Sequence, residues 1–265
     1  MSLRVTVLGC GSSGGVPRIG PMWGECDPTN PRNRRRRCSI LVEKRAGGGT
    51  TSVLVDTSPD LREQLLSVRA EWLDGVLFTH DHADHTHGID DLRMVAHAMK
   101  RRVECYFDAP TRDSLVSRFR YCFETIPGSS YRPILVARDL EPGVPLAIPG
   151  RGGALEALPV LQLHGEIPSL AFRFGGLAYS PDVSGITDSS AALLEGLDVW
   201  IVDALRYRSH PSHFSVKEAL AWIGRLKPKR AILTHMTTDL DYETLRRELP
   251  SNVEPAYDGM VIEAG

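Results

Sequence analysis

The sequence has 265 residues, of which 42% are apolar and 24% are charged, and its formal net charge is -2 at pH 7. These proportions are typical of a globular protein with a sizeable core, and this length suits one large domain or two small ones. A net charge so close to zero creates no global attraction to nucleic acid or to an anionic membrane, which argues against a polynucleotide partner.

The chain shows no sign of a membrane or secreted protein. Its first residues predict a strand and lack the basic start and apolar centre of a secretory signal. No apolar run approaches the roughly 20 residues that a membrane-spanning helix needs. The five cysteines form no CxxC pair, and an odd number without a signal indicates reduced thiols. We therefore expect a soluble protein located in the cytoplasm.

Short β-rich apolar runs recur along the chain and predict strands. They cover residues 5–8, 39–42, 52–56, 75–79, 103–107, 170–174, 199–203, 231–234 and 260–263. Three consecutive glycines at 47–49 separate the second run from the third, which indicates a hairpin.

Helical patterns lie between the later runs. The clearest begins at Ser215, where Ser-Val-Lys-Glu is a capping box, and an apolar face at helical spacing then continues until Pro228. Ser58-Pro59 predicts another helix, with Ser58 as the N-cap and Pro59 at the first helical position. Further helices are expected at residues 92–100, 112–121, 189–197 and 242–248.

The alternation of strands and helices predicts a layered α/β fold. No repeat, low-complexity segment or long linker divides the chain. We therefore expect a single domain over residues 1–265.

The most informative segment is residues 78–88, Phe-Thr-His-Asp-His-Ala-Asp-His-Thr-His-Gly. If the preceding strand stays extended, His80 and His82 point to the same side, and Asp84 and His85 fall in the turn that follows. Imidazoles and carboxylates suit Zn²⁺, Mn²⁺ or Fe. A histidine-rich surface loop that binds metal only by accident is the alternative, and the density of ligands after a strand argues against it.

The motif HxHxDHxxG at residues 80–88 resembles the signature of the metallo-β-lactamase superfamily, whose fold is an αβ/βα four-layer sandwich. The other ligands of that family have counterparts here in the expected order, each after an apolar run: His164, Asp182 and His235. Asp56 resembles the family's early aspartate, which supports the ligands. In isolation, His164 could be a core histidine and Asp182 a turn cap, but their combination with the 80–88 motif favours the ligand interpretation.

The resemblance implies two divalent metal ions, Zn or Mn. One resembles a site held by His80, His82 and His164, and the other a site held by Asp84, His85 and His235. Asp182 would bridge them, and Asp84 and Asp182 would also take part in catalysis. Two such ions acidify a shared water at neutral pH and offset the charge on a phosphoryl group. His87 and His97 have no place in this pattern.

A closer resemblance is to the cyclic phosphodiesterases of the carbon–phosphorus lyase pathway. It rests on the glycine-rich opening at residues 9–17, the arginine-rich run that ends in Arg37-Cys38-Ser39, and His213, which lies 22 residues before His235. The resemblance implies that His213 acts on the phosphate, as general acid or charge stabiliser, before a helix N-terminus suited to an anion. His210 is the competing assignment.

Three further features remain open at the sequence level. Ser12 and Ser13 could bind a phosphate, or could belong to a plain tight turn. Cys26 is the one cysteine left where the related enzymes hold a structural zinc, and Thr238 replaces its histidine, so we expect that zinc to be absent. The arginines at 34–37 could be a nucleic-acid patch, but a solvated or ion-paired surface is more common.

We therefore expect a metal-dependent phosphodiesterase acting on a small, cyclic phosphodiester or a nucleotide. The alternatives are a thioester or lactone hydrolase, a ribonuclease, and a nucleotide-binding protein without hydrolytic activity. The transfer-RNA maturation branch carries a long RNA-binding arm between the ligands that match His164 and Asp182, and only 17 residues lie there in this chain. A homodimer is an expectation from the resemblance.

Overall fold

A computed structural model describes residues 2–128 and 130–264, which form two seven-stranded sheets. The first contains, in spatial order, β14 (Val261–Ala264), β1 (Ser2–Gly9), β2 (Ser39–Ala46), β3 (Gly49–Val55), β4 (Gly75–Leu77), β5 (Val103–Phe107) and β6 (Leu135–Asp139). The second contains β13 (Val253–Pro255), β12 (Arg230–Thr234), β11 (Val199–Asp203), β10 (Leu177–Ser180), β9 (Ile167–Phe174), β8 (Leu155–His164) and β7 (Leu146–Ile148).

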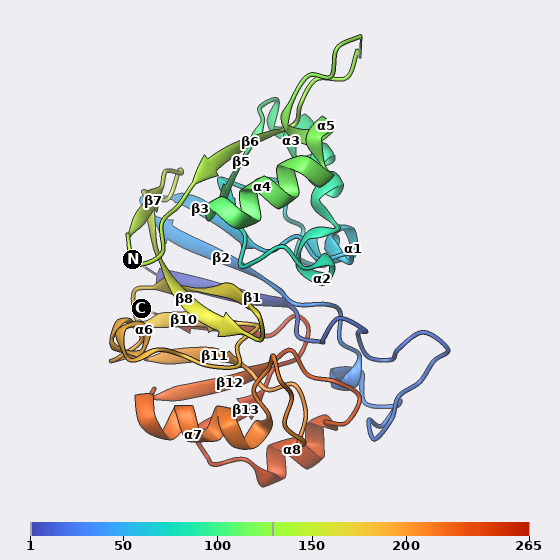
Figure 1. Ribbon diagram of the computed structural model, residues 1–265, viewed down its shortest axis with the longest axis vertical. Helices are drawn as coiled ribbons and strands as arrows, with labels where there is room; N and C mark the ends of the chain where they lie inside the picture. The colour runs from blue at the N-terminus through green and yellow to red at the C-terminus, as the bar shows by residue number, and fades with distance from the viewer. Residues whose placement is uncertain (1, 129, 265) are drawn as a thin grey trace.

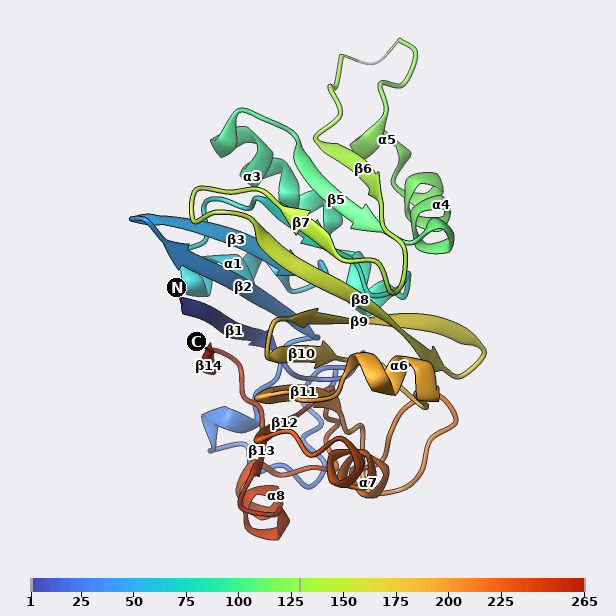
Figure 2. The same cartoon turned by 90° about the vertical axis from the view of Figure 1, so that its left-hand side faces the viewer.

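Helices cover the outer faces of both sheets, as Figures 1 and 2 show. The helices are α1 (Leu61–Val68), α2 (Ala83–Thr86), α3 (Leu92–Met99), α4 (Ala109–Arg118), α5 (Arg120–Phe123), α6 (Asp188–Leu193), α7 (Val216–Leu226) and α8 (Tyr242–Glu248), with 3-10 turns at Pro31–Asn33 and Ile89–Asp91. Helices α1 to α5 lie on the side of the first sheet, and α6 to α8 on the side of the second. This is the four-layer αβ/βα sandwich that the sequence predicts.

Both faces of the first sheet are buried, because its central strands carry apolar residues without a polar alternation. In β3, Val53 and Val55 pack into the core between the two sheets, whereas Leu54 packs into a second core under the helices. Leu61 of α1 and Leu92 of α3 complete that second core. Burying each Val or Leu side chain contributes about 1.5–3 kcal/mol, so this pattern favours four layers over two.

The strand directions bring the ends of several strands to one edge. Strands β3 to β6 are mutually parallel, as are β10 to β13. Strand β8 runs in the same direction as β10, because both are antiparallel to β9. The loops that follow these strands therefore meet, as expected for sites of layered α/β folds.

The helix after β11 agrees with its sequence pattern. Ser215 is the N-cap of α7: its Oγ accepts from the amide of Glu218 at 3.3 Å, and Glu218 Oε2 accepts from the amide of Ser215 at 2.8 Å. This is the reciprocal capping box that was predicted. The hairpin at 47–49 is also confirmed, since Ala46 pairs with Gly49 across the turn.

Other predicted boundaries were wrong. Ser58 is not the N-cap of α1, which begins at Leu61 after Asp60; Ser58 Oγ instead donates to Gln64 Oε1 at 2.9 Å. Helix α4 begins at Ala109, before the predicted residue 112, because Asp108 caps it through the amide of Thr111 at 3.2 Å. Helix α6 ends at Leu193 and not at 197.

The long connection between β1 and β2 is fastened to the segment after β12. Arg35 is buried, and its Nη1 and Nη2 donate to the carbonyls of Thr237 (3.1 Å) and Leu240 (2.7 Å). Cys26 Sγ lies 3.5 Å from the carbonyls of Thr238 and Leu240. A guanidinium and a thiol therefore join these two segments, and we call this cluster the Arg35 brace.

Two observations concern the chain as a whole. All five cysteines are buried, free thiols. Among the helices of residues 2–128 and 130–264, none has the length and apolar character needed to cross a lipid bilayer.

Candidate metal centre

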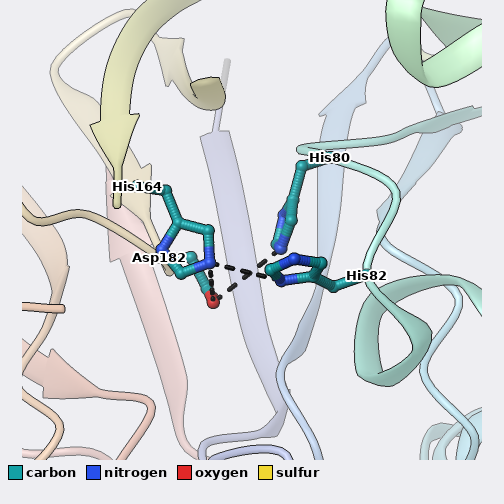
Figure 3. A group of neighbouring side chains, drawn as sticks. All are labelled: His80, His82, His164 and Asp182. Carbon is teal, nitrogen blue, oxygen red and sulfur yellow. Dashed lines mark hydrogen bonds and ion pairs between the residues drawn. The ribbon is translucent and has the colours of Figure 1, made fainter. Parts of the chain in front are cut away.

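Seven side chains from the two sheets converge at the edge where the strand ends meet. The loop after β4 supplies His80, His82, Asp84 and His85, and the second sheet supplies His164, Asp182 and His235. Figure 3 shows four of them pointing toward one another, with His80 and His82 on one side and His164 and Asp182 on the other. The structure thus brings together every residue of the predicted ligand set.

The first group contains His80, His82, His164 and Asp182, whose ligand atoms lie within 4.8 Å of one another. His164 Nε2 is 3.2 Å from His82 Nδ1, and Asp182 Oδ2 is 3.6 Å from His164 Nε2 and 3.9 Å from His80 Nε2. His164 Nδ1 donates to the carbonyl of Ser212 at 2.6 Å, so in the neutral ring the lone pair of Nε2 faces the group.

The second group contains Asp84, His85 and His235. His235 Nε2 lies 3.6 Å from Asp84 Oδ2, and His85 Nε2 lies 3.5 Å from the same oxygen. Asp182 Oδ1 is 3.0 Å from His85 Nε2 and 3.5 Å from His235 Nε2. Asp182 therefore faces the first group with one oxygen and the second group with the other, as a bridging carboxylate would.

Several inward-facing atoms of this cluster are buried and have no hydrogen-bond partner among the described residues. They are His80 Nε2, His85 Nε2, His235 Nε2 and Asp182 Oδ1. The close pair of His85 and Asp182 lies within ion-pair distance but lacks hydrogen-bond geometry. Leaving a buried polar atom unpaired costs about 1–3 kcal/mol. Imidazole and carboxylate donors suit divalent first-row metals, so the residues present fit such ions.

The pKa values of the cluster differ between its histidines. Burial lowers the pKa of His85, but Asp182, Asp84 and Asp56 outweigh burial and raise it well above its usual range. Burial lowers the pKa of His164 to about 4, against the attraction of Asp182, and burial also holds the pKa of His80 well below its usual range. Both rings are therefore neutral at pH 7, which is the form that binds metal. Burial opposes ionisation of Asp84, but the neighbouring His85 outweighs it and holds the pKa of Asp84 below its usual range.

Asp56 orients the ligands from behind. Its Oδ2 accepts from His85 Nδ1 at 2.7 Å and from Thr79 Oγ1 at 2.8 Å, and its Oδ1 accepts from the Thr79 amide at 2.8 Å. Because the Thr79 hydroxyl donates to Asp56, its oxygen accepts from His80 Nδ1 at 3.0 Å. Asp56 thus orients both rings with Nε2 toward the cluster, His85 directly and His80 through Thr79. Asp56 itself belongs to neither ligand group.

The loop that carries the motif is compact. Asp84 and His85 lie on the short helix α2, not in the predicted turn. Gly88 follows it with a φ of -85°, which any residue can adopt. A Cβ at position 88 would lie 2.0 Å from the carbonyl oxygen of Ser58. Gly88 is therefore required for space, so that α2 can approach the end of β3.

His213 adjoins both groups. Its ring stacks on that of His235 at 4.6 Å and lies 4.6 Å from that of His164. His213 Nδ1 donates to Asp203 Oδ2 at 2.8 Å, and Asp203 Oδ2 also accepts from the amide of Val183 at 3.1 Å. Asp203 is fully buried, and its Oδ1 is 3.8 Å from His235 Nδ1.

Asp203 was missed in the sequence. Its signal is the one that identified Asp56: an acidic residue at the end of a buried apolar run. Burial, not fully offset by His235, raises the pKa of Asp203.

Ser12, Ser13 and the first turn of α7 were the other predicted phosphate contacts, and they differ in which of their polar groups are free. The Ser12 amide donates to the carbonyl of Met236 at 3.2 Å, so it is already used in the protein, while the neighbouring Ser13 is exposed. The first turn of α7 is similar: the amides of Ser215, Val216 and Glu218 all bond within the protein. These three amides are therefore unavailable to an anion, whereas the amide of Lys217 has no hydrogen-bond partner among the described residues.

The remaining histidines lie outside the two ligand triads. His210 lies beside His213, with 5.2 Å between ring centroids. His87 and His97 are exposed, and the ring of His87 packs on that of Phe119.

Comparison with known proteins agrees with this architecture. The family model described as a beta-lactamase superfamily domain matches residues 51–236. A new diphosphatase from the PhnP family, whose crystal structure is known, is 33% identical in sequence. Its structure gives a TM-score of 0.86, and the match covers 100% of this chain and 98% of the diphosphatase chain. Zn(2+)-bound PqqB from Methylobacterium extorquens has a TM-score of 0.72 over 98% and 99% of the two chains, and its 18% identity shows the fold alone.

One sequence relative extends beyond this chain. An octanoyltransferase from Porphyromonas gingivalis is 31% identical over 97% of this chain, which spans about half (51%) of that protein. The family model and the PhnP-family structure both cover the motif at residues 80–88 and the strands around it. The chain belongs to the beta-lactamase superfamily and has the metallo-β-lactamase fold.

Proposed function

We propose that this protein hydrolyses a small phosphodiester or nucleotide with two divalent metal ions, Zn or Mn. The proposed ligands are His80, His82 and His164 for the first ion, and Asp84, His85 and His235 for the second. Asp182 would contact both, since its two oxygens face different groups. When bound, such a pair of ions supplies an acidified water and offsets negative charge on a phosphoryl group.

The observation that carries the phosphate assignment is the placement of His213. Its Nδ1 is held by Asp203, which leaves Nε2 as the end that can meet a substrate. The ring lies against His164 on one side and His235 on the other, and so adjoins a proposed ligand of each ion. Because Nδ1 already carries the proton that faces Asp203, Nε2 donates to a phosphate oxygen, or holds the proton that the leaving oxygen takes, when the ring is the doubly protonated imidazolium.

The similarity to a PhnP-family diphosphatase favours a second substrate class, the phosphoanhydride of a diphosphate. The same residues would serve both reactions, because each displaces an oxygen from a phosphoryl group. The difference lies in the leaving group, which is an alcohol in one case and a phosphate in the other.

The test is hydrolysis of bis(p-nitrophenyl) phosphate by metal-loaded protein, with a chelated control. His213→Ala should lower kcat/KM by about 10²–10⁴-fold, the usual contribution of a general acid. His97→Ala is the matched control, because His97 is exposed on α3. A general acid matters more as the leaving group becomes more basic, so the loss should grow with a phenyl ester; a constant loss would assign His213 to phosphate contact.

Other outcomes would redirect the assignment. Protein that holds two metals but cleaves thioesters or lactones faster than any phosphate ester would be an acyl hydrolase. Preferential cleavage of structured RNA would support the ribonuclease alternative. Nucleotide binding without product formation would support a binding protein.

A further inference from the structure

The loop between β11 and α7, residues 204–215, carries a second histidine at position 210. This loop is held in place by its own contacts. Arg206 Nε and Nη2 donate to the carbonyls of Arg208 (3.2 Å) and Ser209 (2.9 Å). Behind it, the amide of Phe214 donates to the carbonyl of Val183 at 2.7 Å. These hydrogen bonds fix the conformation of the loop, and with it the position of His210.

Ser212 connects His210 to the metal centre. Its carbonyl accepts from His164 Nδ1 at 2.6 Å, while its amide and hydroxyl lie 3.3 Å and 3.1 Å from His210 Nδ1. The fit is close, because a Cβ added at Gly165 would lie 2.8 Å from Ser212 Cβ. The same residue thus orients one proposed ligand and His210.

These contacts determine where His210 carries its proton. A backbone amide can only donate, so His210 Nδ1 is an acceptor and the ring proton resides on Nε2. His213 has the opposite arrangement, because its Nδ1 donates to Asp203. Among the described residues, none accepts a hydrogen bond from His210 Nε2.

His210 is also the outer member of a row of rings. The row starts at His85, whose ring centroid is 5.9 Å from that of His235, continues to His213 at 4.6 Å, and ends at His210 at 5.2 Å. His85 is fully buried, the His213 side chain is 11% exposed, and His210 is half-buried. The Nε2–H of His210 is thus a donor on the solvent side of His213.

We propose that His210 is a substrate-binding residue whose Nε2–H donates to a non-bridging oxygen of the phosphate that His213 contacts. The two histidines then have different roles in one site and do not compete for a single role. This inference rests on the proposed function, since it requires a phosphate-bearing substrate.

Two substitutions separate the donor from the loop contact. In His210→Asn, Oδ1 can still accept from the Ser212 amide, but the shorter side chain holds its Nδ2–H₂ donor back from the position of the imidazole Nε2. In His210→Gln, Nε2–H₂ restores a donor near the position of the imidazole Nε2. The affinity of metal-loaded protein for inorganic phosphate would be measured by calorimetry, beside KM and kcat for bis(p-nitrophenyl) phosphate and the metal content of each variant.

A lost hydrogen bond to a charged group corresponds to about a tenfold to hundredfold loss of affinity. We expect His210→Asn to lose phosphate affinity by that factor, with a raised KM, while His210→Gln stays within about threefold of the unmodified protein. Unchanged affinity in His210→Asn would overturn the inference. So would an equal loss in both variants, a loss of metal from His210→Asn, or the absence of phosphate binding by the unmodified protein.

The binding measurement needs no turnover, so the two proposals fail separately. Phosphodiester turnover with normal phosphate affinity in His210→Asn would refute the role of His210 and leave the function standing. The expected affinities in a protein that cleaves no phosphodiester or diphosphate would refute the function and leave His210 as an anion contact.

Discussion

The metal centre and the Arg35 brace both bury charged or ionisable groups in loops at the same edge of the sheets, yet they differ in how these groups are paired. In the brace, both terminal nitrogens of Arg35 donate to main-chain carbonyls. In the metal centre, His80 Nε2, His85 Nε2 and His235 Nε2 are buried without a hydrogen-bond partner among the described residues.

This difference separates groups that stabilise the protein alone from groups that need a ligand. A buried polar atom without a partner destabilises the fold, so a cluster of such atoms is retained where something else completes the pairing. In the brace, the protein itself pairs both terminal nitrogens of Arg35, and only the Nε of this side chain lacks a partner among the described residues. The residues of the metal centre fit divalent cations, which would complete the pairing, and disturbing this site should affect activity before it affects folding.

The largest effect is expected at the shared carboxylate. Asp182→Ala should lower metal content, because both proposed sites lose a ligand, and should reduce phosphodiester turnover by roughly 10³-fold or more, as the ions supply several kcal/mol. Chelation should do the same to the unmodified protein and lower its Tm, because bound metal stabilises only the folded state. Metal analysis, steady-state kinetics and thermal melts measure these effects. Full turnover in protein stripped of metal would contradict the assignment.

The next effect separates catalysis from metal binding. Asp203→Asn replaces the carboxyl group that accepts from His213 Nδ1 with an amide, so kcat should fall by about 10²–10⁴-fold with most of the metal retained. Asp188→Asn is the matched control, since the side chain of Asp188 is 92% exposed and pairs with Arg225. Both variants would be compared by kcat and by metal content. A loss of metal in proportion to activity would instead make Asp203 a support for His235.

A smaller effect is expected in the brace. Arg35→Met removes the two guanidinium hydrogen bonds to the carbonyls of Thr237 and Leu240, and should lower the free energy of unfolding by about 2 kcal/mol or more. The kcat of the folded, metal-loaded variant should not change. Urea unfolding and kinetics would be measured beside Arg34→Met, which alters an exposed arginine. If Arg35→Met kept its free energy of unfolding but lost kcat, Arg35 would serve activity and not stability.

The smallest effect concerns Asp241, the N-cap of α8. Burial opposes its ionisation, but hydrogen bonds from the Thr244 amide (2.9 Å), Asn33 Nδ2 (2.7 Å) and the Asp27 amide (3.2 Å) outweigh burial and lower the pKa of Asp241 to about 2. An unfolded aspartate has a pKa of about 3.9. The carboxylate therefore stabilises the fold above about pH 4, and this contribution is lost as the pH falls toward about 2.

Asp241→Ala should accordingly lower the free energy of unfolding by about 1 kcal/mol at neutral pH, the usual value for a lost cap. Urea unfolding of both proteins at neutral and at acidic pH measures the difference. That difference should shrink below about pH 4. A constant difference would assign the effect to packing and not to the charge.

The residue pattern predicted a layered α/β fold and the metal-binding motif at residues 80–88, and the resemblance to the metallo-β-lactamase superfamily supplied the four layers and the other three side chains. The motif at residues 80–88 places four of the seven in one loop, and His164, Asp182 and His235 each follow an apolar run. Strand ends then bring them to one edge, as the topology requires. The role of these residues as ligands remains a proposal.

What the sequence did not predict depends on contacts between distant segments. Asp203 gains its importance only when the loop before α7 brings His213 to within 2.8 Å of it. The proton on His210 Nε2 depends on the backbone conformation at Ser212, and no residue pattern encodes it. The wrong N-cap at Ser58 has a similar cause, since its hydroxyl oxygen accepts from the amide of Asp60 at 3.1 Å, before α1 begins, and its proton goes to Gln64.

Gly88 has a consequence for how this protein can evolve. It holds no ligand and its backbone needs no special conformation, yet the carbonyl of Ser58 occupies the space of any Cβ there. Alanine at 88 would push α2 away, and with it Asp84 and His85. In a library randomised at positions 80 to 88, selection for function should therefore retain glycine at 88 as strictly as it retains His80, His82 and His85. His87, which is exposed and belongs to neither ligand group, should vary freely.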